Sequence, residues 1–187
     1  MPHNADRLDM SVTFQPVNIA VMTVSDTRTE ADDKSGSLLV SRIKDDGHVL
    51  VDRAIITDDV PRIIGKLKEW IESSQVDAVV TTGGTGLTGR DSTPEAFAAI
   101  VEKDIPGFGE LFRMLSFEKI GTSTVQSRAL AGVAGGTYLF ALPGSTSACK
   151  DGWDDILRYQ LDIRHRPCNF VEIMPRLNES AATRRTG

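Results

Sequence analysis

The chain has 187 residues, with 26 acidic against 21 basic side chains, a net charge of −5 and 40% hydrophobic residues. Because a domain spans about 150 residues, this length predicts one globular domain with its own core. The acidic balance disfavours binding to nucleic acid through a basic surface. No apolar run approaches the roughly 20 residues that cross a membrane, residues 1–15 lack the pattern of a signal peptide, and two cysteines are too few for a disulfide framework. We therefore expect a soluble, cytoplasmic protein with no nucleic-acid or membrane partner.

The polar segments at the two ends are predicted to be loose termini, and the residues between them to form the domain. We expect a single domain at 17–177, with termini at 1–16 and 178–187. In the first half of this domain, short apolar runs alternate with segments whose apolar residues recur at helical spacing. The expected strands are 18–24, 49–56 and 77–81, and the expected helices are 36–46, 60–73 and 94–101.

The second half contains a predicted helix at 108–120 and then two apolar runs, 130–133 and 137–142, around a Gly-Gly pair. Two such runs at this spacing are typical of a β-hairpin. A last helix is predicted from about 145 to 160. Strands that are almost continuously apolar and alternate with helices predict an α/β fold. In this fold, a mostly parallel sheet with one hairpin is covered by helices on both faces.

Two loops are placed where ligands bind in open α/β sheets, beyond the carboxyl ends of the strands. The first, TGGTGLTGRDST at 82–93, follows the third strand. The second, PGSTS at 143–147, precedes the last helix. Glycines let backbone amides approach an anion closely, and hydroxyls and a helix start add further donors. The two loops therefore predict an anion-binding cleft.

The first loop matches two phosphate-binding patterns only in part. Gly84, Gly86 and Gly89 have the spacing of the dinucleotide fingerprint, but that fingerprint belongs after the first strand. If the loop is compared with a P-loop, Arg90 replaces the lysine and Asp91 the hydroxyl residue. A carboxylate repels phosphate unless a cation bridges them, so Asp91 suits a phosphate site assisted by Mg²⁺. Phosphate chemistry with Mg²⁺ is the function that the residues themselves favour.

Other polar residues at strand ends have a structural as well as a functional interpretation. Asp58 and Asp59 precede a predicted helix, so either is an N-cap or a functional carboxylate. Ser25 and Asp26 follow the first strand, where they start a turn or face a ligand. Arg128 precedes the hairpin and is either a surface arginine or a ligand contact.

The two cysteines, Cys149 and Cys168, have no metal-ligand spacing to any histidine. The segment around His165 is not a zinc signature. Both cysteines are therefore predicted to be inert thiols.

The segments TTGGTG at 81–86, RDSTPE at 90–95 and PGFGE at 106–110 carry a family likeness. Together they resemble the molybdenum cofactor biosynthesis proteins MoaB and MogA. FRMLSFE at 112–118, GTST at 121–124 and PGST at 143–146 make the chain most similar to the MoaB branch. The likeness runs from about residue 17 to 177. It implies the three-layer α/β/α fold of these molybdopterin-binding proteins and assembly as trimers or hexamers.

The resemblance also implies a reaction, the adenylylation of molybdopterin, with ATP and molybdopterin as substrates and Mg²⁺ as the metal. The two essential aspartates of the family fall on Asp58, with Asp59 as the alternative register, and on Asp91. Both would be catalytic and would hold Mg²⁺. We expect contacts to molybdopterin or nucleotide, from the resemblance or from a place at a strand end, at Ser25, Asp26, Gly83, Gly84, Thr85, Gly86, Ser127, Arg128, Pro143, Gly144, Ser145 and Thr146.

Two other functions stay open at this point. Because some MoaB relatives lack the first aspartate, the chain can instead be a non-catalytic molybdopterin-binding or scaffold protein of the same pathway. The third hypothesis, that the protein binds an NAD-type dinucleotide, is supported only by the glycine pattern, which does not follow the first strand.

A homo-oligomer is also expected on physical grounds. The predicted helix at 108–120 carries Leu111, Phe112 and Leu115 on one side. An apolar patch around Phe108, Phe112 and Phe117 exceeds what one short helix buries alone, so a second copy is expected to cover it.

Overall fold

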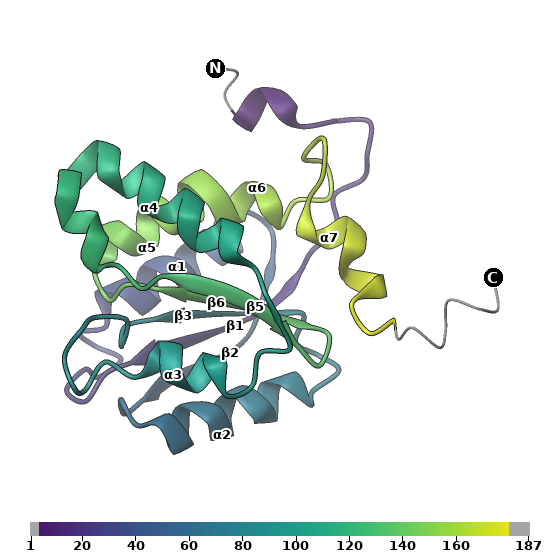
Figure 1. Cartoon of the computed structure of the whole chain (residues 1–187). Coiled ribbons are helices and arrows are strands. Elements are labelled where there is room, and N and C mark those ends of the chain that lie inside the picture. The colour runs from purple at the N-terminus through teal and green to yellow at the C-terminus, as the bar shows by residue number, and fades with distance from the viewer. Residues whose placement is uncertain (1–3, 180–187) are drawn as a thin grey trace.

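A six-stranded sheet forms the centre of the protein (Figure 1), whose computed structural model describes residues 4–179. Its strands are β1 (Asn18–Val24), β2 (Val49–Ile56), β3 (Ala78–Thr82), β4 (Lys103–Asp104), β5 (Leu130–Ala134) and β6 (Thr137–Leu142). They lie in the order β2-β1-β3-β6-β5-β4. The first four in this order are parallel, β5 pairs antiparallel with β6, and β4 pairs antiparallel with β5. The predicted α/β class and the β5–β6 hairpin are confirmed. The short strand β4 was not expected from the sequence.

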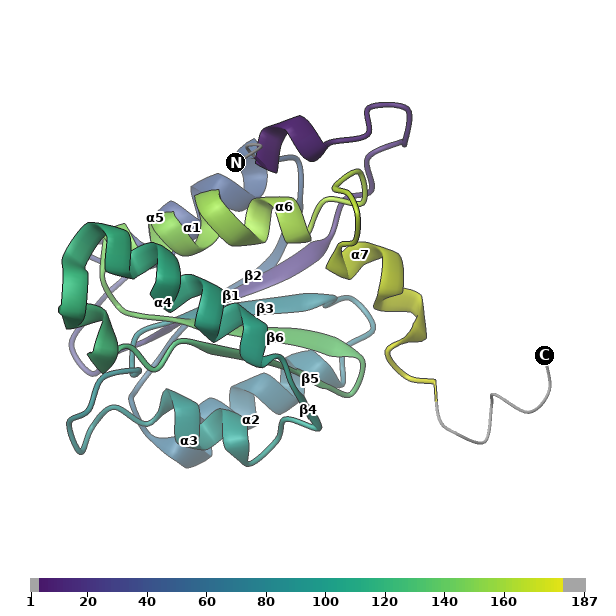
Figure 2. The ribbon, with the colours of Figure 1, turned by 45° about the horizontal axis from the view of Figure 1, so that its top comes forward.

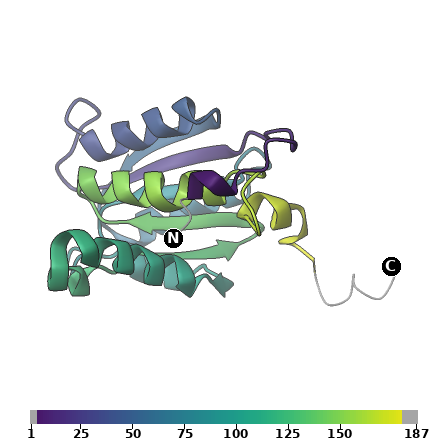
Figure 3. The same ribbon diagram turned by 90° about the horizontal axis from the view of Figure 1, so that it is seen from above.

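Helices cover both faces of the sheet, so the three-layer arrangement is confirmed. One face carries α1 (Lys34–Asp45), α4 (Pro106–Ile120), α5 (Thr146–Gly152) and α6 (Arg158–Gln160), and the other carries α2 (Val60–Ile71) and α3 (Thr93–Ala98). Figure 2 shows α2 and α3 on the opposite side of the sheet from α4, and Figure 3 shows α1, α5 with α6, and α4 side by side. Among residues 4–179, no helix is both long and apolar enough to cross a bilayer.

The last long helix has a π-helical turn, η3 (Trp153–Leu157), between α5 and α6. It begins at Ser145, whose hydroxyl accepts from the Ala148 N–H, as the sequence predicts. The remaining elements are the 3₁₀ turns η1 (Asn4–Arg7), η2 (Gly121–Gln126) and η4 (Met174–Arg176), and the short helix α7 (Phe170–Ile173).

The central strands contribute to two hydrophobic cores, one on each face. On β1, Ile19 and Val21 belong to the core under α1 and α5, and Ala20 and Met22 belong to the core under α2. Successive side chains of a strand point to opposite faces, so a strand covered on both sides is apolar at most of its positions. This double burial holds the carboxyl ends of β1, β3 and β6 in one place.

The orientation of α4 differs from the prediction. Phe108, Phe112 and Ser116, at i, i+4 and i+8, form its buried side, and the Phe108 ring lies 5.3 Å from the ring of Phe140 on β6. The expectation that Phe108 and Phe112 belong to an exposed patch is wrong, because they are only 3% and 2% exposed. Leu111, placed beside Phe112 by the sequence analysis, is instead exposed. The apolar residues that α4 leaves exposed are Leu111, Met114, Phe117 and Ile120.

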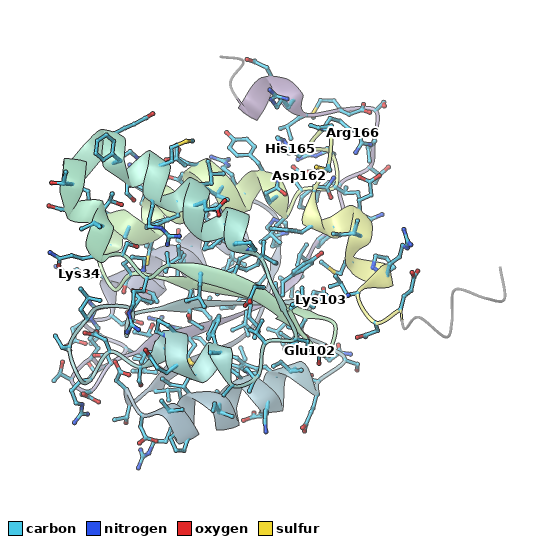
Figure 4. All side chains as sticks on the ribbon, viewed as in Figure 1. Lys34, Glu102, Lys103, Asp162, His165 and Arg166 are labelled. Carbon is cyan, nitrogen blue, oxygen red and sulfur yellow. The ribbon has the colours of Figure 1, made fainter. Side chains whose placement is uncertain are left out.

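The N-terminal segment is attached to the domain over its described part. The Asp9 N–H donates to the Arg164 carbonyl (2.8 Å), and the Arg166 N–H donates to the Arg7 carbonyl (2.9 Å). Figure 4 shows Asp162, His165 and Arg166 beside this segment. The expectation of a loose segment at 1–16 therefore does not describe residues 4–16. Residues 1–3 and 180–187 of the expected loose termini lie outside the described residues.

Two buried histidines lie where this segment meets the domain. The Val17 N–H donates to Nδ1 of His48 (3.1 Å), and Nε2 of His48 and Nδ1 of His165 have no partner among residues 4–179. Burial lowers the pKa of His48, while the carboxylates of Asp46 and Asp162 raise it. Burial lowers the pKa of His165 too, and Arg7 adds to the shift while Asp162 opposes it.

We expect the stability of the fold to decrease when the pH falls below about 6.5, the ordinary pKa of histidine. A base with a lowered pKa binds fewer protons in the folded state than in the unfolded state, so the free energy of unfolding decreases as the pH falls through this range. The loss between about pH 7.5 and about pH 5.5 should be on the order of 1 kcal/mol in urea denaturation. His48→Gln, which keeps an acceptor for Val17, should flatten the dependence. A stability that stays constant over this range contradicts the prediction.

Candidate active site

A pocket of about 720 Å³ lies at the end of the sheet where the parallel strands finish. This is the end at which the loop from β3 to α3 and the turn η2 come together, on the left of Figure 1. Of the predicted site residues, the pocket is lined by Ser25, Asp26, Asp58, Gly83, Gly84, Thr85, Gly86, Asp91, Ser127, Pro143, Gly144 and Ser145. Thr146 and Arg128 are not part of its lining. Loops that follow β1, β2, β3 and β6 therefore meet in one cavity, as expected for an open α/β sheet.

The glycine loop follows β3 with two residues in the left-handed region. Gly83 has φ +96° and Gly84 has φ +65°, conformations that side-chain-bearing residues rarely adopt. A Cβ on Gly83 would lie 2.3 Å from the Val24 carbonyl oxygen, so a side chain has no room there. Thr93 holds the turn from the other side, since its hydroxyl donates to the Gly83 carbonyl (2.9 Å) and its N–H to the Gly84 carbonyl (2.9 Å).

The loop presents backbone donors and carboxylates together. The N–H groups of Gly84 and Thr85 make no hydrogen bond within residues 4–179, and both residues line the pocket. The carboxylate of Asp58 lies against Gly84, where a Cβ would come within 2.9 Å of Oδ2. The carboxylate of Asp91 lies against Gly86, where a Cβ would come within 2.6 Å of Oδ2. Glycine at these positions lets two carboxylates approach the same stretch of backbone.

The structure separates the two adjacent aspartates after β2. Asp59 is the N-cap of α2, and its carboxylate accepts from the Arg62 N–H (3.1 Å). Asp58 lines the pocket instead, where its Oδ1 accepts from the N–H of Ser92 (3.0 Å) and also from the Ser92 hydroxyl. The capping role thus belongs to Asp59, and Asp58 is the carboxylate that faces the glycine loop.

Asp91 is held by the loop to which it belongs. Its Oδ2 accepts from the Thr88 N–H (2.8 Å) and hydroxyl (2.6 Å). The Thr88 hydroxyl lowers the pKa of Asp91, and the N–H groups of Thr88 and Gly86 lower it further, against the opposing effect of partial burial. The carboxyl is therefore ionised at neutral pH. Asp91 is not the N-cap of α3, since that position belongs to Ser92.

Asp26, at the end of β1, connects two parts of the pocket wall. Its Oδ1 accepts from the Asp58 N–H (3.1 Å), and its Oδ2 pairs with the exposed guanidinium of Arg90. Ser25 starts the turn after β1, since its hydroxyl accepts from the Thr27 and Arg28 N–H groups. The turn and the pocket-facing role, both considered from the sequence, are thus combined in this pair of residues.

Arg128 has the contacts of a salt-bridged surface arginine, the first of the two interpretations that the sequence left open. Its guanidinium donates to the carbonyls of Gly86 (2.8 Å) and Asp91 (2.7 Å), and it pairs with Glu95 of α3. These contacts fasten both ends of the Gly86–Asp91 loop to the segment before β5. In this structure Arg128 positions the loop from outside the pocket, whereas its neighbour Ser127 lines the pocket.

One wall of the pocket was not expected from the sequence. It is formed by α4 and η2, which contribute Phe112, Ser116, Ile120, Ser123, Thr124 and Gln126. The only sequence signal was the GTST run directly after the predicted helix, since hydroxyl residues also serve as ordinary caps and turns. A second omission is Arg28, which lines the pocket from the loop after β1.

Neither Cys149 nor Cys168 is part of the pocket lining in the described structure. Cys149 is buried, and burial raises the pKa of its thiol to about 11. It donates to the Thr82 hydroxyl (3.0 Å), at the end of β3. A protonated, buried thiol agrees with the predicted inert role for Cys149.

The arrangement defines a class of protein. It is a three-layer α/β protein with a pocket for a ligand that carries phosphate groups. Free backbone amides on a glycine loop, carboxylates beside them and arginines on the wall suit such a ligand.

Comparisons with known proteins identify the family. The family described as "Probable molybdopterin binding domain" matches residues 20–163, and the chain belongs to it. Molybdenum cofactor biosynthesis protein B of Escherichia coli (strain K12) is 51% identical over 161 residues, which cover 86% of this chain and 95% of that protein. The protein of the same name from Staphylococcus epidermidis is 44% identical over 151 residues, 79% of this chain and 86% of that one.

Solved structures agree with this assignment. A crystal structure of a molybdenum cofactor biosynthesis protein B has a TM-score of 0.79 and 38% identity, covering 87% of this chain and 96% of that one. The tungsten cofactor synthesizing protein MoaB from Pyrococcus furiosus has a TM-score of 0.70 and 39% identity, covering 76% of this chain and 91% of that one. The resemblance to MoaB and MogA that the motifs indicate is confirmed.

We expect Gly83→Ala to destabilise the fold and to disturb the pocket. The substitution combines a left-handed backbone with a Cβ 2.3 Å from the Val24 carbonyl, so the free energy of unfolding should fall by about 2 kcal/mol or more. Gly89→Ala is the matched control in the same loop, because a Cβ added at Gly89 would meet no atom within 4 Å and the residue has no positive φ. It should change the stability by less than about 1 kcal/mol. Equal effects in urea denaturation would show that the turn does not require glycine.

Proposed function

We propose that the protein catalyses the Mg²⁺- and ATP-dependent adenylylation of molybdopterin, a step of molybdenum cofactor biosynthesis. Membership of a molybdopterin-binding family and relatives named for this pathway support the substrate. The observation that carries the catalytic part is the approach of two carboxylates, Asp58 and Asp91, to the backbone of one glycine loop in one pocket.

The two carboxylates fit a magnesium site that the substrate completes. Residues 4–179 contain no group of three or more His, Cys, Asp or Glu side chains that could hold a metal by themselves. Mg²⁺ is usually held by one or two carboxylates together with substrate phosphates, so a pair is sufficient. Asp58 uses Oδ1 for Ser92 and leaves Oδ2 toward Gly84, and Asp91 is ionised. Asp58 and Asp91 would hold the ion, which when bound neutralises phosphate charge.

The reaction itself is a nucleotidyl transfer. An oxygen of the terminal phosphate of molybdopterin attacks the α-phosphorus of ATP, the bond from this phosphorus to the bridging oxygen breaks, and pyrophosphate leaves with the electron pair. Such transfers depend mainly on positioning and charge stabilisation. In this chain the amides of Gly84 and Thr85 would bind phosphate oxygens, and Arg128 would keep the loop in place from outside.

Incubation of the purified protein with molybdopterin, ATP and Mg²⁺ tests the proposal. Formation of adenylyl-molybdopterin and pyrophosphate is the expected result, detected by chromatography of the reaction products. If molybdopterin binds but no product forms, the catalytic proposal fails and the non-catalytic role in the same pathway takes its place. Binding of NAD at micromolar concentration would favour the dinucleotide alternative instead.

We expect Asp58→Asn and Asp91→Asn each to reduce the rate of transfer by two or more decades. Each change keeps the side chain's size but removes a charge, which corresponds to about 3 kcal/mol for a charge-stabilising group. Molybdopterin affinity should stay within a few-fold, which an equilibrium titration measures. Asp59→Asn is the matched control, since asparagine caps a helix as well as aspartate and the Asp59 carboxylate accepts from the Arg62 N–H at the start of α2. Near-normal transfer by Asp58→Asn or Asp91→Asn would remove that residue from the catalytic assignment.

The exposed apolar residues of α4 support assembly into a homo-oligomer, for which the family resemblance implies a trimer or hexamer. Met114, Phe117 and Ile120 are each more than half exposed, and Leu111 is 37% exposed. Contiguous exposed apolar surface of this kind typically marks a protein interface.

We expect light scattering at micromolar concentration to give a mass of three or six chains. The double variant Met114→Asp with Phe117→Asp should dissociate the assembly, because it places charges in the apolar contact. Ile173→Asp is the control, an exposed apolar residue of α7 that lies outside α4. A monomeric wild-type protein contradicts the prediction.

A further inference from the structure

Arg28 lines the pocket but has no role in the site described so far, which consists of the glycine loop and the carboxylates. It follows β1 and lines the cavity with a side chain that is 34% exposed. Its Nη2 donates to the Gly144 carbonyl (3.1 Å) and its Nη1 donates to the Ser35 hydroxyl. The residue therefore joins the loop after β1 to the loop after β6.

The buried carboxylate of Asp33 lies next to the guanidinium of Arg28. The side chain of Asp33 is fully buried, and its Oδ1 lies 3.6 Å from Nη1 of Arg28. Burial by itself raises the pKa of Asp33, but hydrogen bonds from Thr23 (2.6 Å), Arg53 (2.9 Å) and the Gly36 N–H (3.0 Å) outweigh it and lower the pKa. Asp33 is therefore an anion at neutral pH. Its place directly before Lys34, which Figure 4 labels, puts it at the same end of the sheet as the glycine loop.

The guanidinium of Arg28 has N–H groups that are free to bind a ligand. An arginine side chain carries five N–H groups, and the hydrogen bonds to Gly144 and Ser35 use two of them. Because Asp33, Ser35 and Gly144 already fix the orientation of the side chain, little conformational entropy remains to be lost when a ligand binds.

The other charges of the pocket favour a further cation at the place where an anionic ligand binds. Asp26, Asp58 and Asp91 all line the cavity, and Arg90, the other arginine in its lining, already pairs with Asp26. Phosphate oxygens are repelled by uncompensated carboxylates, and planar guanidinium groups bind them through paired hydrogen bonds.

We propose that Arg28 is a phosphate-binding residue of this site, held in place by the buried Asp33, and that it binds the substrate on the side of the Pro143–Ser147 loop. The proposal rests on the proposed function for the identity of the substrates. The shared ligand chemistry is a phosphate oxyanion, which either ATP or molybdopterin supplies. Asp33 and Ser35 act through Arg28 and are positioning residues.

Arg53 offers a matched control for the structural part of this role. Its Nη2 donates to the same carboxylate, at 2.9 Å from Asp33 Oδ2, but Arg53 lies on β2 and is not part of the pocket lining. Removing either arginine takes one cation from Asp33. Only the removal of Arg28 also takes a cation from the pocket.

The test is equilibrium titration of the full chain with inorganic pyrophosphate, ATP and molybdopterin, each in separate experiments. Arg28→Met should weaken binding in at least one arm about tenfold or more, the loss expected for a hydrogen-bonded charge pair. Arg28→Lys, which keeps the charge but not the planar fork, should lie between it and wild type. Arg53→Met should stay within about twofold in every arm, and circular dichroism should show that all variants are folded.

The arms distinguish the source of the phosphate. Loss in the pyrophosphate and ATP arms assigns Arg28 to the nucleotide, and loss only in the molybdopterin arm assigns it to the phosphate of the pterin. Unchanged binding of Arg28→Met in all three arms overturns the proposal, as does an equal loss in Arg53→Met. If the wild-type protein shows Arg28-dependent pyrophosphate binding but forms no adenylyl-molybdopterin, the proposed function fails while this inference stands.

Discussion

The left-handed turn of Gly83 and Gly84 is the constraint on which the rest of the site depends. β3 ends between β1 and β6, and the chain must turn there against the Val24 carbonyl of β1 and beside Gly144 after β6. Only residues without a Cβ fit this approach. The turn then directs the loop across the strand ends, where Asp58 and Asp91 reach its backbone.

Two aspartates near this turn, Asp91 and Asp33, are kept ionised by different sets of hydrogen-bond donors. Asp91 is kept ionised by hydroxyl and amide donors of its own loop, and Asp33 by buried donors and Arg53. The two anions thus have different functions in the fold. Asp91 faces the cavity, where its charge is available to a ligand. Asp33 is buried outside the pocket lining, where its charge orients Arg28 and Arg53. Free amides and oriented cations at strand ends are the general means by which α/β proteins bind phosphate.

Much of this organisation could be predicted from local sequence. The run at 18–24 is almost continuously apolar, the helix at 60–71 has a clear apolar face, and Ser145 is a favourable N-cap residue. The order of the elements and their layers follow from these local features. The orientation of α4 could not be predicted in the same way. Its apolar residues lie all around the helix, and only packing against Phe140 selects Phe108 and Phe112 as the buried side.

By itself, the sequence determined the α/β class, the positions of the two ligand loops and the residue types that they carry, because these follow from periodicity and from glycine's conformational freedom. The tertiary structure decided which of two adjacent aspartates caps α2 and which faces the pocket, that Arg128 fastens a loop and that Arg28 lines the cavity. These outcomes depend on contacts between residues far apart in the chain, such as Arg28 with Gly144. A local pattern names the side chain that is present, but only the packing of distant segments fixes what that side chain touches.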